Sequence, residues 1–201
     1  MAVPRSTTPE ERRQHILQTA ATLFAQKGIH ETSMDDIVQA TGLSKGSLYW
    51  YFHNREDLLL TLLQLFLDQE LQLLQSVQEQ EGPASERLYS MLERYIQQLA
   101  QAAHLLPVTL DFYAMATRQE KIRHFFQSYY QRFRLLVKEI LQQGLVREEF
   151  LPFDPDEISI ALIALLEGTT LLGIIEPEHI QLEKHALPAC RFLLESLKKP
   201  S

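Results

Sequence analysis

Hydrophobic residues recur along nearly the whole chain with the spacing of one helical face, and no segment alternates with the two-residue period of a strand. Capping residues and glycines separate these stretches at short intervals. The pattern predicts an all-α fold of about nine helices joined by short turns. These helices are expected at residues 8–28, 33–42, 44–51, 54–81, 84–102, 105–117, 119–143, 154–175 and 181–198.

Polar side chains mark where several of these helices begin. Thr8 and Ser33 each stand three residues before an acidic residue, which predicts a capping box at both positions. Ser44 and Asn54 are expected to cap the third and fourth helices. Gly144 follows a long amphipathic stretch and is expected to end the seventh helix.

The first three helices follow the order of a helix-turn-helix. The second helix is only two turns long, and Gly42 then allows a sharp reversal because glycine has no side chain. The small Ala40 lets the two helices approach each other, and Leu48 can fill the space beneath the third. We predict a helix-turn-helix domain that binds DNA at residues 1–53 and a second helical domain at residues 54–201, to which the family resemblance given below assigns ligand binding and dimerisation.

The third helix carries side chains that suit contacts with DNA. Lys45 and Ser47 can reach base edges or phosphate oxygens, and Tyr49 can contact a thymine methyl group. Arg55 can bind the DNA backbone from the start of the fourth helix. The candidate DNA contacts in and around this helix are Ser44, Lys45, Gly46, Ser47, Tyr49, Trp50, Tyr51, His53 and Arg55, and the family resemblance given below adds Ser33. For Trp50, packing inside the protein is the favoured interpretation and a base contact the alternative.

The charge distribution limits how DNA can be bound. The whole chain has a net charge of −7. Residues 1–57 hold six Lys/Arg and seven Asp/Glu, which gives −1, and the remainder holds 13 and 19, which gives −6. DNA binding must therefore depend on a few well-placed cations and not on bulk charge.

Other kinds of site are disfavoured. The run from Gly42 to Gly46 fits the G-x-S-x-G pattern of hydrolases, but a nucleophile elbow needs a preceding strand that this sequence lacks. The seven histidines show no zinc-ligand spacing, so we expect no metal and no cofactor. A single cysteine excludes an internal disulfide, and the N-terminus lacks a signal-peptide core, so we expect a cytoplasmic protein. Because neither a nucleophile–base pair nor a metal-ligand set is visible, we expect that it is not an enzyme.

Several segments carry a family resemblance: Thr32-Ser33-Met34-Asp35-Asp36-Ile37-Val38, Ala40-Thr41-Gly42-Leu43-Ser44-Lys45-Gly46-Ser47-Leu48-Tyr49, Tyr51-Phe52 and Asn54-Arg55-Glu56-Asp57-Leu58-Leu59. Over roughly residues 10–60 they resemble the N-terminal signature of TetR/AcrR-type transcription regulators. The resemblance implies a homodimeric repressor, released from a near-palindromic operator when a small molecule binds its C-terminal domain. Tyr51 stands where His is frequent in the family, and Arg55 where Lys is frequent, which leaves the operator sequence open.

Two sets of residues in the C-terminal part are candidates for ligand binding and dimerisation. Aromatic, methionine and polar residues at helical spacing are typical of a core, or of a largely apolar cavity with few polar anchors. The candidate ligand contacts are His104, Asp111, Phe112, Met115, Phe125, Tyr129 and Glu167. The last two long helices are expected to form the dimer interface through Leu162, Leu165, Leu166, Thr169, Leu172, Cys190, Leu193 and Leu194.

Residues 158–175 are apolar on almost every side, which admits two interpretations. A membrane span is disfavoured because Glu167 interrupts the segment and it has only 18 residues. A helix covered by its own domain on one side and by a second subunit on the other fits better. Glu167 then needs a partner, either a Thr hydroxyl or an Arg across the dimer, or else a cationic or hydrogen-bonding effector, and the first is favoured.

Two further function classes remain open. A helical-bundle enzyme would need converging titratable groups, and no nucleophile–base pair is visible. A helix-turn-helix used only for protein contacts would leave DNA binding insensitive to loss of Lys45.

Overall fold

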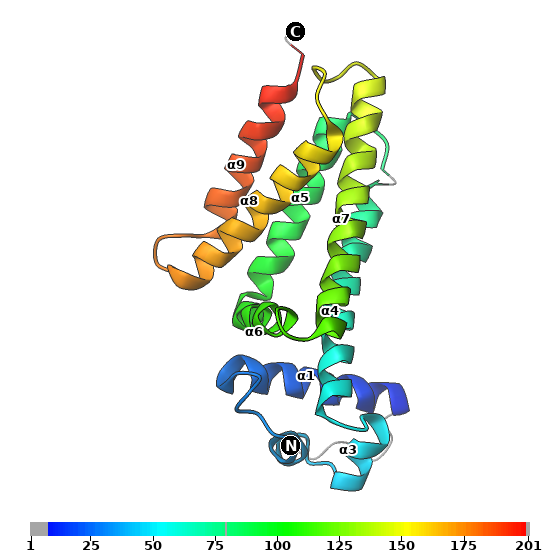
Figure 1. Ribbon diagram of the computed structural model, residues 1–201, viewed down its shortest axis with the longest axis vertical. Helices are drawn as coiled ribbons and strands as arrows, with labels where there is room; N and C mark the ends of the chain where they lie inside the picture. The colour runs from blue at the N-terminus through cyan, green and yellow to red at the C-terminus, as the bar shows by residue number, and fades with distance from the viewer. Residues whose placement is uncertain (1–7, 79, 200–201) are drawn as a thin grey trace. The chain divides into compact units, whose positions relative to one another are not determined.

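A computed structural model describes residues 8–78 and 80–199, except the side chains of Leu73, Gln78 and His104. This part of the chain contains nine α-helices, one short 3-10 helix and no strand, so the predicted all-α class is confirmed (Figure 1). The helices are α1 (Pro9–Lys27), α2 (Met34–Thr41), α3 (Lys45–Tyr51), α4 (Arg55–Gln78), α5 (Ala84–Gln101), α6 (Leu106–Ala116), α7 (Glu120–Val146), α8 (Pro155–Ile175) and α9 (Leu182–Leu197), with η1 (Ala103–Leu105) before α6.

The predicted helix starts are confirmed by their capping contacts. Both capping boxes are formed, with the backbone amide of Glu11 donating to Thr8 over 3.2 Å and that of Asp36 donating to Ser33 over 3.1 Å. The side chain of Asn54 accepts from the backbone amide of residue 57 at 2.8 Å, which satisfies a free donor in the first turn of α4.

Gly144 does not end α7, so that prediction is wrong. The helix continues to Val146, and a Cβ atom at Gly144 would lie 2.3 Å from the Phe150 ring and 2.7 Å from the Cβ of Ala84. The glycine therefore permits a close approach of the chain segments around it. The turn comes later, at Glu148, which takes a positive φ of 58°.

The chain divides into two compact units. The first contains residues 1–66 and 104–123, and the second contains residues 67–103 and 124–201. These limits differ from the boundary at 53/54 drawn from the sequence, because α6 and the first half of α4 join the first unit. Compactness alone does not say which residues bind DNA or ligand, so the functional division remains a prediction.

The first unit is organised around α1. Its buried face, which includes Ile16, Ala20 and Phe24, lies against the neighbouring helices α2 and α6. Leu48 of α3 and Phe52, which follows it, are also fully buried.

In the second unit, α9 packs against α5 and α8 (Figure 1). By length and composition, α8 is the only helix in the described part of the chain that could cross a membrane. Only 28% of its most apolar stretch is buried within the subunit. Much of its apolar surface therefore has no cover from the chain itself.

Candidate nucleic-acid interface

The turn between α2 and α3 follows from local interactions. Thr41 is buried and donates its hydroxyl to the carbonyls of Ile37 and Val38 at 2.8 and 3.1 Å. Gly42 then takes the left-handed conformation, with φ 68° and ψ 13°, and its amide bonds to the Val38 carbonyl. The hydroxyl of Ser44 accepts from the amide of Ser47 at 3.1 Å and starts α3. The predicted helix–turn–helix is confirmed, and the element directly before Ser44 is helix α2, whereas a hydrolase elbow would require a strand there.

One face of α3 is anchored and the other is open to solvent. Leu48 is fully buried, whereas Tyr49 and Trp50 are exposed, Trp50 by 71%. The Trp50 and Tyr51 rings meet edge to face with centroids 4.7 Å apart. The packing interpretation of Trp50 was therefore wrong, since the indole lies on the exposed surface of α3. The residues predicted to contact DNA through a hydroxyl group, a cation or an aromatic ring thus lie on α3 or next to it.

Lys45 has an acidic neighbour that sequence analysis missed. Its ammonium group lies 2.8 Å from the carboxylate of Asp35 on α2, and both side chains are exposed. The hydrogen bond and charge of Asp35 raise the pKa of Lys45, so this lysine is fully charged. Asp35 also places a negative charge beside the cation that is expected to meet phosphate.

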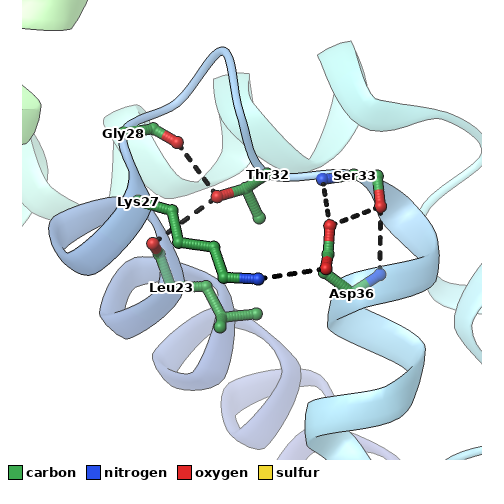
Figure 2. Close-up of polar contacts among 6 residues, drawn as sticks. All are labelled: Leu23, Lys27, Gly28, Thr32, Ser33 and Asp36. Atoms are coloured by element: carbon green, nitrogen blue, oxygen red, sulfur yellow. Dashed lines mark hydrogen bonds and ion pairs between the residues drawn. The ribbon is translucent and has the colours of Figure 1, made fainter.

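A network of polar contacts connects α1 to the start of α2 (Figure 2). The buried hydroxyl of Thr32 donates to the Gly28 carbonyl at 2.9 Å and lies 3.5 Å from that of Leu23. Asp36 accepts from both the amide and the hydroxyl of Ser33, and Lys27 donates to it at 3.1 Å. The Ser33 hydrogen bonds, assisted by Lys27, lower the pKa of Asp36 to about 2. Ser33 is therefore engaged in capping, which fixes where its exposed side chain can meet DNA.

Arg55 and Asp111 hold the backbone carbonyl and the backbone amide of the same residue, Ile29. Asp111 of α6 accepts a hydrogen bond from the Ile29 amide at 3.1 Å, and the Arg55 guanidinium donates to the Ile29 carbonyl. The Nε of Arg55 is buried and has no partner among the described residues. Arg55 thus points into the protein and not outward to a phosphate, and this corrects its predicted position. Asp111, a candidate ligand contact in the sequence, instead contacts the loop after α1.

The other candidate ligand residues fall into both units. Met115 lines a pocket of about 540 Å³ in the first unit, together with Leu59, Leu60 and Ile122. Phe112 lines a smaller recess near Phe66 in the same unit. Phe125, Tyr129 and Glu167 belong to the second unit, and the His104 side chain lies outside the described residues. Their shared contact with a ligand stays a prediction.

Half of the predicted dimer contacts are placed wrongly. The side chains of Leu162, Leu166, Cys190 and Leu194 are buried within the subunit, so they cannot supply contact area to a partner. Leu165, Thr169 and Leu193 are half-buried, and Leu172 is exposed. The error arose because α8 is apolar all round, and periodicity alone does not say which side faces the helix's own domain.

Two sequence profiles match this chain. One, described as bacterial regulatory proteins of the tetR family, matches residues 16–62, and one described as the C-terminal domain of BetI-type transcriptional repressors matches residues 84–198. An uncharacterised HTH-type transcriptional regulator of Bacillus subtilis, YfiR, is 28% identical over 151 residues, covering 73% of this chain and 71% of YfiR. The HTH-type transcriptional repressor KstR2 of Mycolicibacterium smegmatis is 40% identical over 68 residues, covering 34% of this chain and 33% of the repressor.

Solved structures show the same fold. A TetR transcription regulator from Haloarcula marismortui superposes with a TM-score of 0.84 at 16% identity, covering 94% of this chain and all of that one. A regulator from Saccharomonospora viridis in complex with choline gives 0.83 at 23% identity, covering 95% and 100%. FadR from Bacillus subtilis in complex with stearoyl-CoA gives 0.75 at 20% identity, covering 92% and 97%. The chain belongs to the TetR family of bacterial regulatory proteins, with a BetI-type C-terminal domain, and is a DNA-binding transcription regulator and not an enzyme.

Proposed function

We propose that this protein is a cytoplasmic repressor that binds a near-palindromic operator as a homodimer and leaves it when a small molecule binds the C-terminal bundle. The observation that carries the proposal is the geometry of α3. Leu48 fixes the helix from below, and Lys45 and Trp50 extend from it into solvent. This arrangement suits insertion of a short helix into the major groove.

A dimer is needed because one helix-turn-helix has little electrostatic attraction for DNA. Residues 1–57 carry a net charge of −1, so counterion release by a single copy would be small. Two copies of α3, held about 34 Å apart, would read two half-sites in successive major grooves. The separation of the two helices then decides whether both can bind together.

The exposed side of α8 offers the surface for this dimer. Ile160, Leu171 and Ile175 are exposed large apolar residues along it, and Phe192 of α9 is 79% exposed. A second copy covering these side chains would remove them from water, which stabilises the assembly in proportion to the apolar area buried. We therefore assign the dimer contact to these exposed residues in place of the four buried ones.

The effector is expected to have a substantial apolar part, since ligand cavities of helical bundles are mostly apolar. Choline and stearoyl-CoA bind proteins that share this fold, and the two molecules differ greatly in size and charge. The fold alone therefore does not identify the effector of this chain.

The contacts at Ile29 supply a route from α6 and α4 to the DNA-binding helices. Asp111 and Arg55 hold the amide and carbonyl of the same residue, and Thr32, three residues later, precedes the cap of α2. A shift of either helix would move this loop and change how α2 and α3 are presented to DNA.

We expect Asp111→Ala to weaken operator binding roughly 5- to 10-fold, and Asp111→Asn, which keeps an accepting oxygen, to weaken it less.

The proposal is tested by measuring DNA binding with duplexes from the region flanking the protein's own gene and with random duplexes of equal length. We expect a salt-sensitive preference for one near-palindromic site. Lys45→Ala should weaken binding to both DNAs, because a phosphate contact is not sequence-specific. Tyr49→Ala and Trp50→Ala should cost more on the operator than on random DNA.

Lys138→Ala provides a matched control for Lys45→Ala, since Lys138 is also paired with an aspartate but lies on α7 in the other unit. The proposed function fails if the flanking DNA binds no better than random DNA. It also fails if Lys45→Ala and Lys138→Ala have equal effects.

A further inference from the structure

Arg55, in the first turn of α4, is a half-buried cation that forms no ion pair within the described part of the chain. Its guanidinium donates to the Ile29 carbonyl, and its buried Nε has no partner among the described residues. A guanidinium has five N–H donors arranged as a fork, so one accepting carbonyl leaves most of them unused. A cation that is partly removed from water needs an anion or further acceptors. Arg55 therefore favours an acceptor supplied from outside the chain.

The same arginine lines the pocket of about 540 Å³ in the first unit. The pocket is formed by the start of α4, the end of α6 and the start of α7, and all its lining residues belong to this one unit. Its apolar lining comes from the buried Leu59, Met115 and Ile122 and the half-buried Leu60. Sites for small molecules typically enclose about 300–1,000 Å³ and combine apolar walls with a few polar groups. The pocket has the size and the lining of such a site.

The charged groups of the pocket favour an anion over a cation. Lys121 of α7 and Glu56 of α4 lie 3.1 Å apart, so these two charges offset each other. Glu120 is exposed and interacts with another group of the chain. Arg55 is thus the charge of the pocket that lacks a counter-ion among the described residues. A carboxylate suits it best, because two oxygens can accept two parallel N–H bonds from one guanidinium.

We propose that this pocket binds an apolar carboxylic acid, whose carboxylate pairs with Arg55 and whose hydrocarbon part lies against Leu59, Leu60 and Met115. The site belongs to the unit that carries α3, and it is separate from the ligand site proposed for the C-terminal bundle. The protein would therefore respond to a second kind of ligand.

This second ligand is expected to strengthen DNA binding. The pocket is present in the conformation in which Arg55 and Asp111 hold Ile29. Arg55 can keep the Ile29 carbonyl and bind a carboxylate as well, because its fork has donors to spare. A ligand that binds this conformation raises its population and so holds the loop that leads to α2. The effect on DNA rests on the proposed function, whereas the binding of the acid does not.

Pairs of acids and amides test the chemistry of the site. We compare 4-phenylbutyrate with 4-phenylbutanamide, and 2-naphthoate with 2-naphthamide, by calorimetric titration of the full-length protein. Each amide has nearly the shape of its acid but no charge, so at least one acid should bind about 10-fold more tightly than its amide. Equal affinities within both pairs, or no binding of either acid, overturn the inference.

Substitutions on α4 test whether the acid occupies this pocket. Leu60→Trp fills part of the pocket and should weaken acid binding about 10-fold or more. Leu65→Trp, at an exposed position of α4 outside the pocket lining, should leave it unchanged. A folded Leu60→Trp variant that binds the acid as the wild type does overturns the assignment to this pocket.

A gain of affinity is also expected, and misfolding would not produce it. Glu56→Gln removes a negative charge from the pocket and should tighten acid binding about 2- to 5-fold at low salt. Asp68→Asn is the matched control, because Asp68 is also an exposed acid of α4 paired with a cation of α7, Arg132, at 3.4 Å, but does not line the pocket. Equal effects of the two substitutions contradict the proposed position of the carboxylate.

Arg55→Lys keeps the positive charge but not the fork of donors. It should lower the affinity for the acid several-fold and leave the affinity for the amide nearly unchanged. Thermal unfolding shows whether the variant is folded. A folded Arg55→Lys protein with the full preference for the acid would exclude a paired contact between the carboxylate and the guanidinium.

Fluorescence anisotropy with a labelled operator duplex tests the coupling. A saturating concentration of the acid should raise operator affinity roughly 5-fold, and the operator should raise the affinity for the acid by the same factor. Unchanged or weaker operator binding overturns the inferred direction of regulation. Absence of acid preference with intact operator binding rejects this site alone, whereas absence of operator preference in ligand-free protein rejects the proposed function.

Discussion

Thr32 is a single side chain on which the join between α1 and α2 depends. Its hydroxyl is buried and donates to the Gly28 carbonyl, so removing it leaves a partly buried acceptor without that donor (Figure 2). Thr32→Val keeps the shape and is expected to lower the free energy of unfolding by about 1–2 kcal/mol. Urea unfolding measures this. Thr22→Val is the control, because Thr22 makes a similar bond to Gln18 on an exposed surface and should change stability far less.

Asp35 affects DNA affinity through its charge. Its carboxylate lies beside Lys45 and would face the same phosphates, so it weakens sequence-independent attraction. We expect Asp35→Asn to tighten binding to random DNA several-fold and to steepen the salt dependence by up to about one unit of slope. Fluorescence anisotropy at a series of salt concentrations measures both. Unchanged affinity for random DNA would mean that the Asp35 carboxylate does not act on bound DNA.

At the scale of a helix, Gly144 shows how a glycine can serve packing in place of termination. A Cβ at this position of α7 would overlap the Phe150 ring and the Ala84 methyl group. Gly144→Ala is therefore expected to destabilise the protein by about 1–3 kcal/mol, although alanine favours helix by about 1 kcal/mol. Gly46→Ala is the matched control, because that helical glycine has open space around it and should be neutral or stabilising. A Gly144→Ala variant as stable as the wild type would show that Phe150 moves away easily.

Helix starts were predictable because capping is local. Thr8, Ser33 and Asn54 each interact with residues three positions away, and such contacts are visible in the sequence. The role of Gly144 was not predictable from the sequence. A glycine that ends a helix and a glycine that makes room for Phe150 look the same in the sequence, and only the position of Phe150 in the fold distinguishes them. The spacing of Glu70 with the leucines of α4 did indicate that its side chain is buried. This was missed because the abundance of leucine there concealed one acidic residue at a core position.

For the molecule as a whole, the apolar character of α8 predicted a subunit interface but not which side of the helix forms it. Leu162 and Leu166 point into the subunit, whereas Ile160 and Leu171 are exposed. The side that is buried depends on how α9 and the rest of the second unit pack, which no local pattern encodes. Trp50 is a different case, because its surface position follows from Leu48 facing inward, which the sequence did predict.

Dimerisation links the exposed side of α8 to DNA recognition, and it can be tested separately from DNA binding. Leu171→Asp would bury a charge at the proposed contact in both subunits, at a cost of several kcal/mol, which shifts the dissociation constant by at least about 100-fold. Light scattering during size-exclusion chromatography should show dimers for the wild type and monomers for this variant. The Leu135→Asp variant, in which the replaced leucine of α7 is about equally exposed, should remain dimeric.

Because the net charge of residues 1–57 is −1, the monomeric Leu171→Asp variant should also lose operator binding although α3 is intact. A dimeric Leu171→Asp protein would place the interface elsewhere, and a monomer with full operator affinity would show that one recognition helix is sufficient.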